Sequence, residues 1–436
     1  MSAIFLPAKK EPIVRAQNHF GLKLSIEEQR LLSVVSSAVP IPLGTRTGSE
    51  WQRGRDRGDP RGRLVVEEID PFDAFSPFTR AWRALQRSAG RLPFTSYEWN
   101  AAWFRHLSRR RFGVGDRAMV KAIWNRDGEL VGVAPFMLTE LPSRGPLRLR
   151  CLQFFGADPN LTEVRGMLAH PDYEGAAYGA LLDHLDARSD DWDWVVLAGV
   201  PNDEAAETLI SRWPGAELRN TLQQCVVELP ATWRAFKTTR ARNIKESLRK
   251  CENSLARDGL EPVFRVAEPG RAFATALDDF FRLHRARALR EDTTRHADFF
   301  EKHDAKRFLS ALATASSIRI FTMDIGGQTV AARIGFVESD TLYLYYSGYD
   351  TAFARYSVMT HLVAEAIQYA IALGLGSVNL SPGIDVSKTR WSPRIVETKT
   401  FLLPSRGARG AAAMRAYDDV RRLLKAPLAL IDSLRK

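Results

Sequence analysis

The sequence has few cysteines and histidines, the residues that form disulfide frameworks and zinc sites. Its 436 residues include three cysteines, Cys151, Cys225 and Cys251, and these lie far apart with no Cys-x-x-Cys or Cys/His spacing. A disulfide framework and a zinc site of standard spacing are therefore excluded, and a reducing cytoplasm fits best. The eight histidines form no His-x-His or His-x-x-x-His pair. We therefore expect no metal cofactor.

Long apolar runs are also missing. No stretch approaches the ~20 uninterrupted apolar residues that a membrane-spanning helix requires. The first 17 residues, MSAIFLPAKKEPIVRAQ, lack the apolar segment of a secretion signal. These observations predict a soluble, cytoplasmic protein.

Acidic residues are outnumbered by basic ones. The chain has 62 Lys and Arg against 51 Asp and Glu, a formal net charge of +11. A basic balance attracts nucleic acid, acidic membrane surfaces or phosphate-bearing small molecules, but it is equally compatible with a solvated basic surface.

Two segments of the chain repeat the same pattern. Residues 120–140 and 318–339 each contain two apolar runs around a tight turn, at Asp127-Gly128 and at Gly326-Gly327. This pattern predicts two β-hairpins. Each hairpin is followed by a third strand, a long helical stretch and a short buried strand. The matched order favours a duplicated α/β domain over a chance hairpin match.

The pattern of composition divides the chain into four parts. Residues 1–63 are predicted to be a flexible arm, because their Gly/Arg-rich segment 44–63 cannot bury enough surface to offset its ordering entropy. Within it, Ser25 caps a short predicted helix at 25–39. The remaining parts are a first lobe (64–231), a second lobe with a basic bridge (232–405) and a C-terminal amphipathic helix (406–436).

Helical and strand patterns fill both lobes. Ser96 is a predicted N-cap, and Trp99, Trp103 and Phe104 recur at helical spacing as core residues. In the first lobe we expect helices at 76–86, 96–107 and 175–188 and strands at 147–155, 194–198 and 224–229. In the second we expect helices at 272–289, 299–312 and 358–373 and strands at 341–350 and 377–383.

The bridge, residues 232–259, is predicted to be a basic helix with Gly259 as its C-cap. Three interpretations stay open: a solvated face, a phosphate or nucleic-acid contact, or one wall of a substrate groove. Because exposed aromatic residues are not interleaved with its cations, the pattern is weak evidence for nucleic acid.

A strand runs through a short loop at 351–357 into the helix that begins at Val358. Free backbone N–H groups at a helix start, together with the helix dipole, suit an anion such as a pyrophosphate. An ordinary strand-to-helix turn is the alternative interpretation.

Three segments carry a resemblance to a known family: FTSYEWNAAWFRHL (94–107), RARNIKESLRKCENSLARDG (240–259) and YYSGYDTAFARYSVMTHLVAEAIQYAIALGLGSVNLSPGIDVSKTRW (345–391). Their order resembles the GNAT acyltransferase superfamily, and more narrowly its CelD/BcsL-like cellulose-biosynthesis branch, which is related to the two-lobed FemAB transferases. The resemblance implies an α/β fold of two tandem GNAT-like lobes, each a mixed sheet flanked by helices.

The resemblance also implies a function and a cosubstrate. It implies N-acyl transfer from acetyl-CoA or another acyl-CoA to an amine, with an amino sugar or another amine in exopolysaccharide or envelope metabolism as the acceptor. The pyrophosphate maps onto the loop and helix start of Ala354, Arg355, Tyr356, Ser357, Val358 and Met359. Relatives commonly carry Ser-Pro-Gly where this chain has Ser-Val-Met, and Arg355 can pair with a phosphate instead.

Candidate catalytic and substrate-binding residues follow from the same resemblance. Asp350 is the candidate base or amine-orienting carboxylate, although an Asp at this position also caps turns. Tyr346 and His284 are further catalytic candidates; both residue types are also common as core residues. The implied substrate-binding residues are Tyr349, Lys388 and Trp391.

Two other functions remain open. One is an aminoacyl-tRNA-dependent transferase like the FemAB relatives, which draws on the basic bridge and the net charge; nucleic acid is otherwise not expected. The other is a non-catalytic scaffold that binds an acidic partner or a membrane surface. Residues 411–436 either pack onto the second lobe or contact the inner membrane peripherally through an apolar face flanked by cations.

Overall fold

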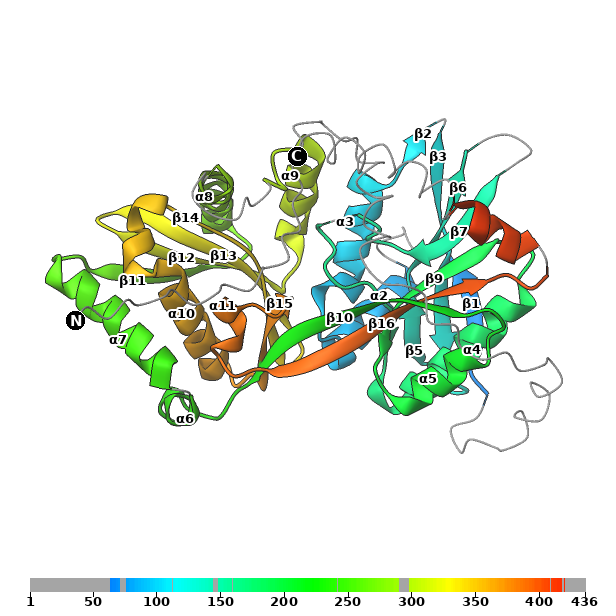
Figure 1. The fold of residues 1–436 in the computed structure, drawn as a ribbon, viewed down its shortest axis with the longest axis horizontal. Coiled ribbons are helices and arrows are strands. Elements are labelled where there is room, and N and C mark those ends of the chain that lie inside the picture. Colours follow the sequence, from blue (N-terminus) through cyan, green and yellow to red (C-terminus); the bar gives the residue numbers. More distant parts are fainter. Residues whose placement is uncertain are drawn as a thin grey trace, which may run out of the picture.

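The computed structural model describes residues 63–419, except for 71–75, 112, 144–147, 159, 241, 290–297, 408 and 418. Residues 1–62 of the predicted arm, with its helix at 25–39, and the chain beyond residue 419 lie outside the described residues. Figure 1 shows two lobes joined by two long strands.

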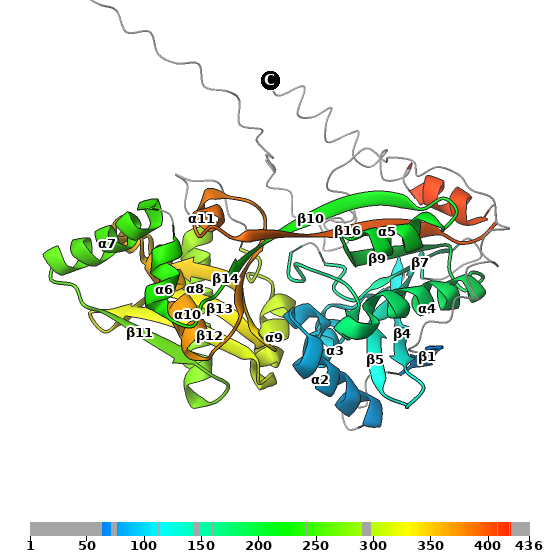
Figure 2. The same ribbon diagram turned by 90° about the horizontal axis from the view of Figure 1, so that it is seen from below.

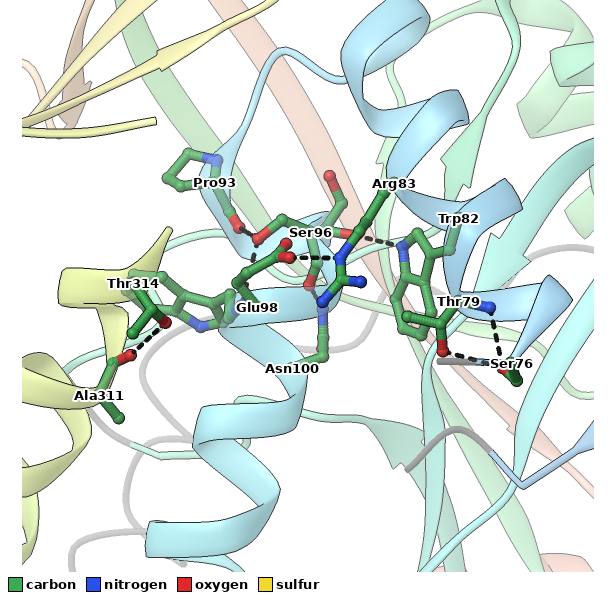
Figure 3. Close-up of polar contacts among 12 residues, drawn as sticks. Ser76, Thr79, Trp82, Arg83, Pro93, Ser96, Glu98, Asn100, Ala311 and Thr314 are labelled. Atoms are coloured by element: carbon green, nitrogen blue, oxygen red, sulfur yellow. Dashed lines mark hydrogen bonds and ion pairs between the residues drawn. The ribbon is translucent and has the colours of Figure 1, made fainter. Parts of the chain in front are cut away.

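The first lobe opens with two capped helices, α2 (Pro77–Ala89) and α3 (Tyr97–Leu107). The side chain of Ser76 accepts a hydrogen bond from the Thr79 amide at 3.1 Å, and that of Ser96 accepts one from the Trp99 amide at 3.2 Å. These bonds satisfy amides that the helix itself leaves unpaired. Figure 3 shows the two caps and the Arg83–Glu98 ion pair, with N–O 2.7 Å, that links the helices. Both predicted helices and the Ser96 cap are confirmed.

The first predicted hairpin forms a small separate sheet. This sheet has the strand order β1 (Val65–Ile69), β4 (Val120–Trp124), β5 (Leu130–Ala134) and β8 (Leu168–Ala169). The hairpin β4–β5 is antiparallel, as predicted. Its second apolar run is divided at Pro135, which has no N–H to donate to a ladder. After this proline the chain enters the larger sheet as β6 (Phe136–Leu141).

The larger sheet has twelve strands and spans both lobes. In spatial order it consists of β11 (Pro262–Ala267), β12 (Ile318–Ile325), β13 (Gln328–Glu338), β14 (Thr341–Tyr349), β15 (Ser377–Pro382), β10 (Glu217–Glu228), β16 (Arg394–Pro404), β9 (Trp194–Pro201), β7 (Leu149–Phe154), β6, β3 (Val114–Ala118) and β2 (Arg110–Arg111). The second hairpin, β12–β13, is antiparallel and confirmed.

The two lobes repeat one strand–helix–strand unit. In the first lobe β7 and β9 are parallel and pair at three positions, from Cys151–Trp194 to Gln153–Val196. In the second lobe β14 and β15 are likewise parallel and pair at three positions, from Thr341–Ser377 to Tyr343–Asn379. This equivalence supports the duplication inferred from the sequence.

The last strand of each half crosses the boundary between the lobes. Strand β10 follows the first lobe but pairs with β15 of the second, whereas β16 follows the second lobe but pairs with β9 of the first. The two strands also pair with each other over most of their length. Figures 1 and 2 show them running side by side through the molecule.

Helices flank the sheets. The remaining helices are α4 (Glu174–Ala187), α5 (Glu204–Ser211), α6 (Trp233–Thr239), α7 (Arg242–Arg257), α8 (Arg271–Ala288), α9 (His303–Ala311), α10 (Val358–Ala372) and α11 (Val386–Thr389). The predicted bridge is therefore two helices, because the first ends at a C-cap on Arg240. Helix α8 packs on the interlobe core, and α10 packs on a separate core with α7.

An aromatic core joins the lobes. The ring centroids of Phe94 and Tyr343 are 5.1 Å apart, and those of Trp99 and Tyr345 are 5.7 Å apart. Both pairs meet edge to face, a favourable geometry for aromatic rings. Residues of α3 thus pack directly against β14 of the second lobe.

The start of the C-terminal segment packs on the first lobe. Residues 409–417 are helical, and Ala413 and Met414 are buried beside Trp194. The ring of Tyr417 lies 5.2 Å from that of Trp194. For the described residues of this segment, the expectation of packing onto the second lobe is therefore wrong. Within residues 63–419, as far as they are described, no helix has the length and apolarity to cross a membrane.

Candidate functional site

The parallel strands β14 and β15 part soon after they begin. Their pairing ends at Tyr343 and Asn379. Just beyond, β14 has a bulge: Arg333 pairs with Ser347 and Gly335 pairs with Leu344, so two residues of β14 lie opposite one of β13. Beyond this point β14 no longer pairs with β15, and a strand edge of this kind can bond to an extended ligand with amide groups.

Three tyrosines of β14 reach the first lobe at this point. The hydroxyl of Tyr343 donates to the Glu163 carboxylate at 2.7 Å. The hydroxyl of Tyr345 donates to the Leu161 carbonyl, and that of Tyr346 donates to the Asn160 carbonyl at 2.6 Å. A first-lobe loop is thereby fixed against the bulged strand.

Asp158 organises this loop from within. Its carboxylate accepts hydrogen bonds from the Trp103 indole at 2.7 Å and from the Thr162 hydroxyl at 2.9 Å. At the far end of the loop, the Arg165 carbonyl lies against Gly199 of β9, which has φ +70°; a β-carbon at Gly199 would overlap this carbonyl. The bonds of Asp158 and the contact of Arg165 hold the loop on either side of Glu163.

The environment of Glu163 raises its pKa to about 7. Burial is the main cause; it is opposed by the hydrogen bond from Tyr343 and by the positive charges of Lys388 and Arg333. A carboxyl group with this pKa is both a proton acceptor and a proton donor near neutral pH.

Lys388 and Arg333 act on this carboxylate, and Arg287 acts on Arg333. Burial lowers the pKa of Arg333 to about 10 and also lowers the pKa of Arg287 and of Lys388. We call Glu163, Arg287, Arg333, Tyr343 and Lys388 the interlobe polar cluster. Its members come from the first-lobe loop, α8, β13, β14 and α11.

Two of the predicted catalytic residues lie together beside this cluster. The rings of His284 and Tyr346 are 5.6 Å apart. The His284 Nδ1 is 3.1 Å from the Ser347 carbonyl oxygen, and its Nε2 is 4.0 Å from the Asp298 carboxylate. His284 is buried.

Asp350 lies at the end of β14 and caps the following turn. Its side chain accepts a hydrogen bond from the Ala352 amide at 3.0 Å. This is the arrangement of the turn-capping interpretation. The same carboxylate stays a proposal as a catalytic group.

The predicted pyrophosphate loop, residues 354–359, lies against α7. Arg355 pairs with Asp258 at 3.4 Å, and the Tyr356 hydroxyl donates to the same carboxylate at 2.8 Å. Ser357 has φ +52° and no side-chain capping bond, so the first amides of α10 are not capped from within the helix. Arg390 is 3.4 Å from the Thr360 hydroxyl and adds a cation nearby.

The predicted substrate-binding residues are dispersed. Trp391 is buried in the core under α10, and its carbonyl accepts a hydrogen bond from Arg240. Tyr349 is half-buried at the end of β14. The Lys388 ammonium donates to the Pro382 carbonyl and is 3.7 Å from the Asp385 carboxylate. Of the three, only Lys388 belongs to the interlobe polar cluster.

Glu163 and Arg333 were missed in the sequence. Arg333 did have a signal: it is a single charge in the apolar run VAARIGF of a predicted strand, and such a residue is rarely buried without a reason. Glu163 had none, since it lies in irregular structure whose position depends on contacts with another lobe.

Among the described residues, no group of three or more His, Cys, Asp or Glu side chains is arranged to hold a metal ion.

Comparisons with known proteins bear on the second lobe and on the fold. Residues 242–389 match the sequence model of a family described as the acetyltransferase (GNAT) domain. This segment contains β14, α10 and β15. It also contains four members of the interlobe polar cluster, namely Arg287, Arg333, Tyr343 and Lys388. No curated protein sequence matches the chain.

Solved structures align with most of the chain. FemX aligns over 77% of this chain and 96% of its own, with a TM-score of 0.53 and 11% identity. The L-PGS of Bacillus licheniformis aligns over 81% and 97%, with a TM-score of 0.46 and 13% identity. A tandem GNAT protein from the clavulanic acid biosynthesis pathway aligns over 79% and 100%, with a TM-score of 0.41 and 11% identity. The likeness to FemX shows the fold: two lobes of mixed α/β structure, as predicted, the second carrying a GNAT acetyltransferase domain pattern.

Proposed function

We propose that the protein is an acyl-CoA-dependent N-acyltransferase of the CelD/BcsL-like kind, which transfers an acetyl group to an amine. The observation that carries this proposal is the parting of β14 from β15 within the segment that matches the GNAT domain. The pantetheine arm of CoA is an extended chain with two amides, so it can bond to strand groups left unpaired at such a point.

Residues of the interlobe polar cluster supply the acid–base chemistry. The thioester supplies the acyl carbon, to which the amine nitrogen bonds as the carbon–sulfur bond breaks. Glu163 accepts the proton that the amine loses, and its pKa of about 7 makes the carboxylate abundant at neutral pH. Tyr343 holds this carboxylate in place. Three further catalytic candidates lie along β14: Tyr346 within the strand, Asp350 directly after it, and His284, which contacts the strand from α8.

The loop at 354–359 is our candidate for the CoA pyrophosphate. Uncapped amides at the start of α10 and the cations Arg355 and Arg390 support this assignment. Tyr349 and Trp391 are proposed to contact substrate, although Trp391 would do so only through a change in its packing.

The acceptor and the location rest on the sequence resemblance. It points to an amino sugar in exopolysaccharide or envelope metabolism, in the cytoplasm or at the inner membrane. Because residues 414 and 417 pack on the first lobe, the membrane contact is assigned to residues 420–436. Cosedimentation with anionic liposomes, comparing the full chain with a chain ending at residue 419, tests it. Equal sedimentation of both proteins would contradict the contact.

Transfer itself is tested by release of free CoA thiol. Purified protein, acetyl-CoA and a panel of amines that includes glucosamine should release thiol in proportion to acetylated amine, measured by mass spectrometry. A second candidate, aminoacyl-tRNA-dependent transfer, draws on the exposed cations Arg242, Lys245, Arg249 and Lys250 of α7. Binding of charged tRNA without binding of CoA would replace the first proposal by the second.

A further inference from the structure

Arg333 has an unusual position for an arginine. It lies in the middle of β13, and its Nε is buried with no hydrogen-bond partner among the described residues. Its Nη2 reaches the Leu344 carbonyl only at 3.5 Å. A buried polar group without a partner is rare in folded proteins and calls for an explanation, such as a ligand that pairs with it.

The other cations of the interlobe polar cluster add to this positive charge. Arg287 donates to the Ser347 hydroxyl at 3.2 Å, and Lys388 reaches the Pro382 carbonyl. Both contacts are to neutral oxygens, and Lys388 also lies 3.7 Å from the Asp385 carboxylate. Among the described residues, the acids that act on Arg333 and Lys388 are Asp385, whose side chain is 55% exposed, and Glu163, whose pKa of about 7 leaves it only partly charged at neutral pH. Within the described part of the site, the buried charge of Arg333 is therefore only partly balanced.

We propose that the acceptor carries an anionic oxygen group, a carboxylate or a phosphoryl group, besides its amine, and that Arg333 and Lys388 bind this group. The inference rests on the proposed function, because it names the class of acceptor for the same site. A guanidinium group offers parallel N–H donors that match the geometry of either anion. Glu163, in the same cluster, is then placed to take the proton of the amine.

The anion of the acceptor and the phosphates of CoA are assigned to different cations. Arg333 pairs with Phe321 and lies between Ala332 and Ile334, so its side chain leaves β13 on the face of the sheet that α10 covers. The charges that act on Arg333 include that of Glu163, the proposed proton acceptor, whereas Arg355 pairs with Asp258 beside the predicted pyrophosphate loop. The acceptor anion is therefore assigned to Arg333, and the Kd for CoA in the variants distinguishes it from a CoA phosphate.

The experiment compares matched acceptors. Glucosamine 6-phosphate is paired with glucosamine, and 6-aminohexanoate with hexylamine, so that each pair differs by one anionic group. We expect kcat/KM to be at least about tenfold higher for one or both anionic members, as a charge-assisted pair supports. The phosphate pair and the carboxylate pair distinguish the two sources of the anion. A ratio near one in both pairs would overturn the inference while leaving acyl transfer established.

Variants connect the preference to the cluster. In Arg333→Met and in Lys388→Met the ratio should fall toward one, through a higher KM for the anionic acceptor, while the Kd for CoA stays unchanged. Arg271→Met, at an exposed position at the start of α8, is the matched control and should keep the preference. A preference that survives both cluster variants, or a Kd for CoA that rises as much as the KM, would overturn the assignment.

Folding and function are separated by two further measurements. Circular dichroism checks that Arg333→Met folds; if it does not, Lys388→Met on the surface helix α11 carries the test. Calorimetric titration with glucosamine 6-phosphate in the presence of CoA measures binding without turnover. Saturable binding that is lost in the cluster variants, without any acetyl transfer, would retain the anion site and reject the proposed function. The absence of both saturable binding and an acceptor preference would reject the anion site.

Discussion

The hydroxyl of Tyr343 donates a hydrogen bond to the Glu163 carboxylate across 2.7 Å, and this contact joins β14 of the second lobe to a loop of the first. The phenol is fully buried and its own pKa is raised well above its usual value by burial. It therefore stays protonated at physiological pH and donates this hydrogen bond. One carboxylate is thus held at the point where the two parallel strands part.

Replacing Glu163 by Gln should remove the proton acceptor while keeping an oxygen for Tyr343. Loss of a general base lowers turnover by roughly 10²–10⁴-fold. We expect this loss in kcat with an unchanged Kd for CoA, measured by thiol release and calorimetry. Glu140→Gln, in a surface ion pair with Arg148, is the matched control and should behave as wild type. A Glu163→Gln variant with wild-type kcat would rule out this carboxylate as the base.

Replacing Tyr343 by Phe should move the pH profile. The hydrogen bond from Tyr343 stabilises the charged carboxylate and so opposes the rise in the pKa of Glu163. Without it that pKa rises above about 7, so the acidic limb of kcat/KM should shift to higher pH. The variant should be slower than wild type near pH 6.5 and approach it near pH 9. An acidic limb at an unchanged pH would show that Glu163 does not control the rate.

The sequence predicted those elements whose signals are local. Turn glycines marked both hairpins, and Ser96 marked the start of α3. Strands β11 and β16 were not predicted. The core of β16, Val396 to Phe401, contains Glu397, Thr398, Lys399 and Thr400, so it lacks a clear apolar alternation; its stability comes from pairing with β9 and β10 on both sides.

The candidate site was predicted only where it coincides with the family pattern. Lys388, His284 and Tyr346 were named, but Glu163 was not. Glu163 and Tyr343 are 180 residues apart in the chain, and the contact exists because a loop of one lobe docks on a strand of the other. A contact between residues so far apart cannot be predicted from hydrophobic periodicity or from a short sequence motif.

Replacing Gly348 by Ala should destabilise the second lobe. Helix α8 passes so close to β14 that a β-carbon at Gly348 would overlap the backbone of Leu283 and His284. Because those atoms are backbone, shortening the His284 side chain cannot relieve the overlap. Overpacking of this kind typically lowers the free energy of unfolding by about 1–3 kcal/mol, which thermal or denaturant unfolding would measure. Gly179→Ala, in α4 with open space around it, is the control and should be neutral or stabilising.

Replacing Arg355 by Glu should weaken CoA binding. The change removes a charge-assisted contact to a phosphate and adds repulsion, a loss of roughly 1–3 kcal/mol. Because the Arg355 side chain is 72% exposed and already pairs with Asp258, the lower part of that range is expected. Arg257→Glu, which alters the other arginine paired with Asp258, is the control. Equal Kd values for CoA in the wild type and both variants would exclude the loop at 354–359 as the pyrophosphate site.

Replacing Glu338 by Gln should stabilise the protein at alkaline pH. The carboxylate of Glu338 is buried between the lobes and accepts a hydrogen bond from the Gln86 amide at 2.9 Å. Burial raises its pKa from 4.5 to about 7, against the opposing hydrogen bonds of Gln86 and Ser317. Between these two values the folded protein holds a proton that the unfolded chain has released, so the free energy of unfolding falls as the pH rises and levels off above about 7.

The amide introduced by Glu338→Gln would stay neutral and still accept the bond from Gln86, so the variant escapes this loss. A shift of this size corresponds to at most about 3 kcal/mol, and less if the site relaxes. We therefore expect the variant to melt several degrees above wild type at pH 8, and the difference to close by pH 4, where both side chains are neutral. The raised pKa of Glu163 affects both proteins equally and cancels in the comparison. Glu228→Gln, whose side chain is 63% exposed, should show no such pH-dependent difference. Identical melting temperatures of wild type and Glu338→Gln at pH 8 would mean that Glu338 ionises in the folded protein without penalty.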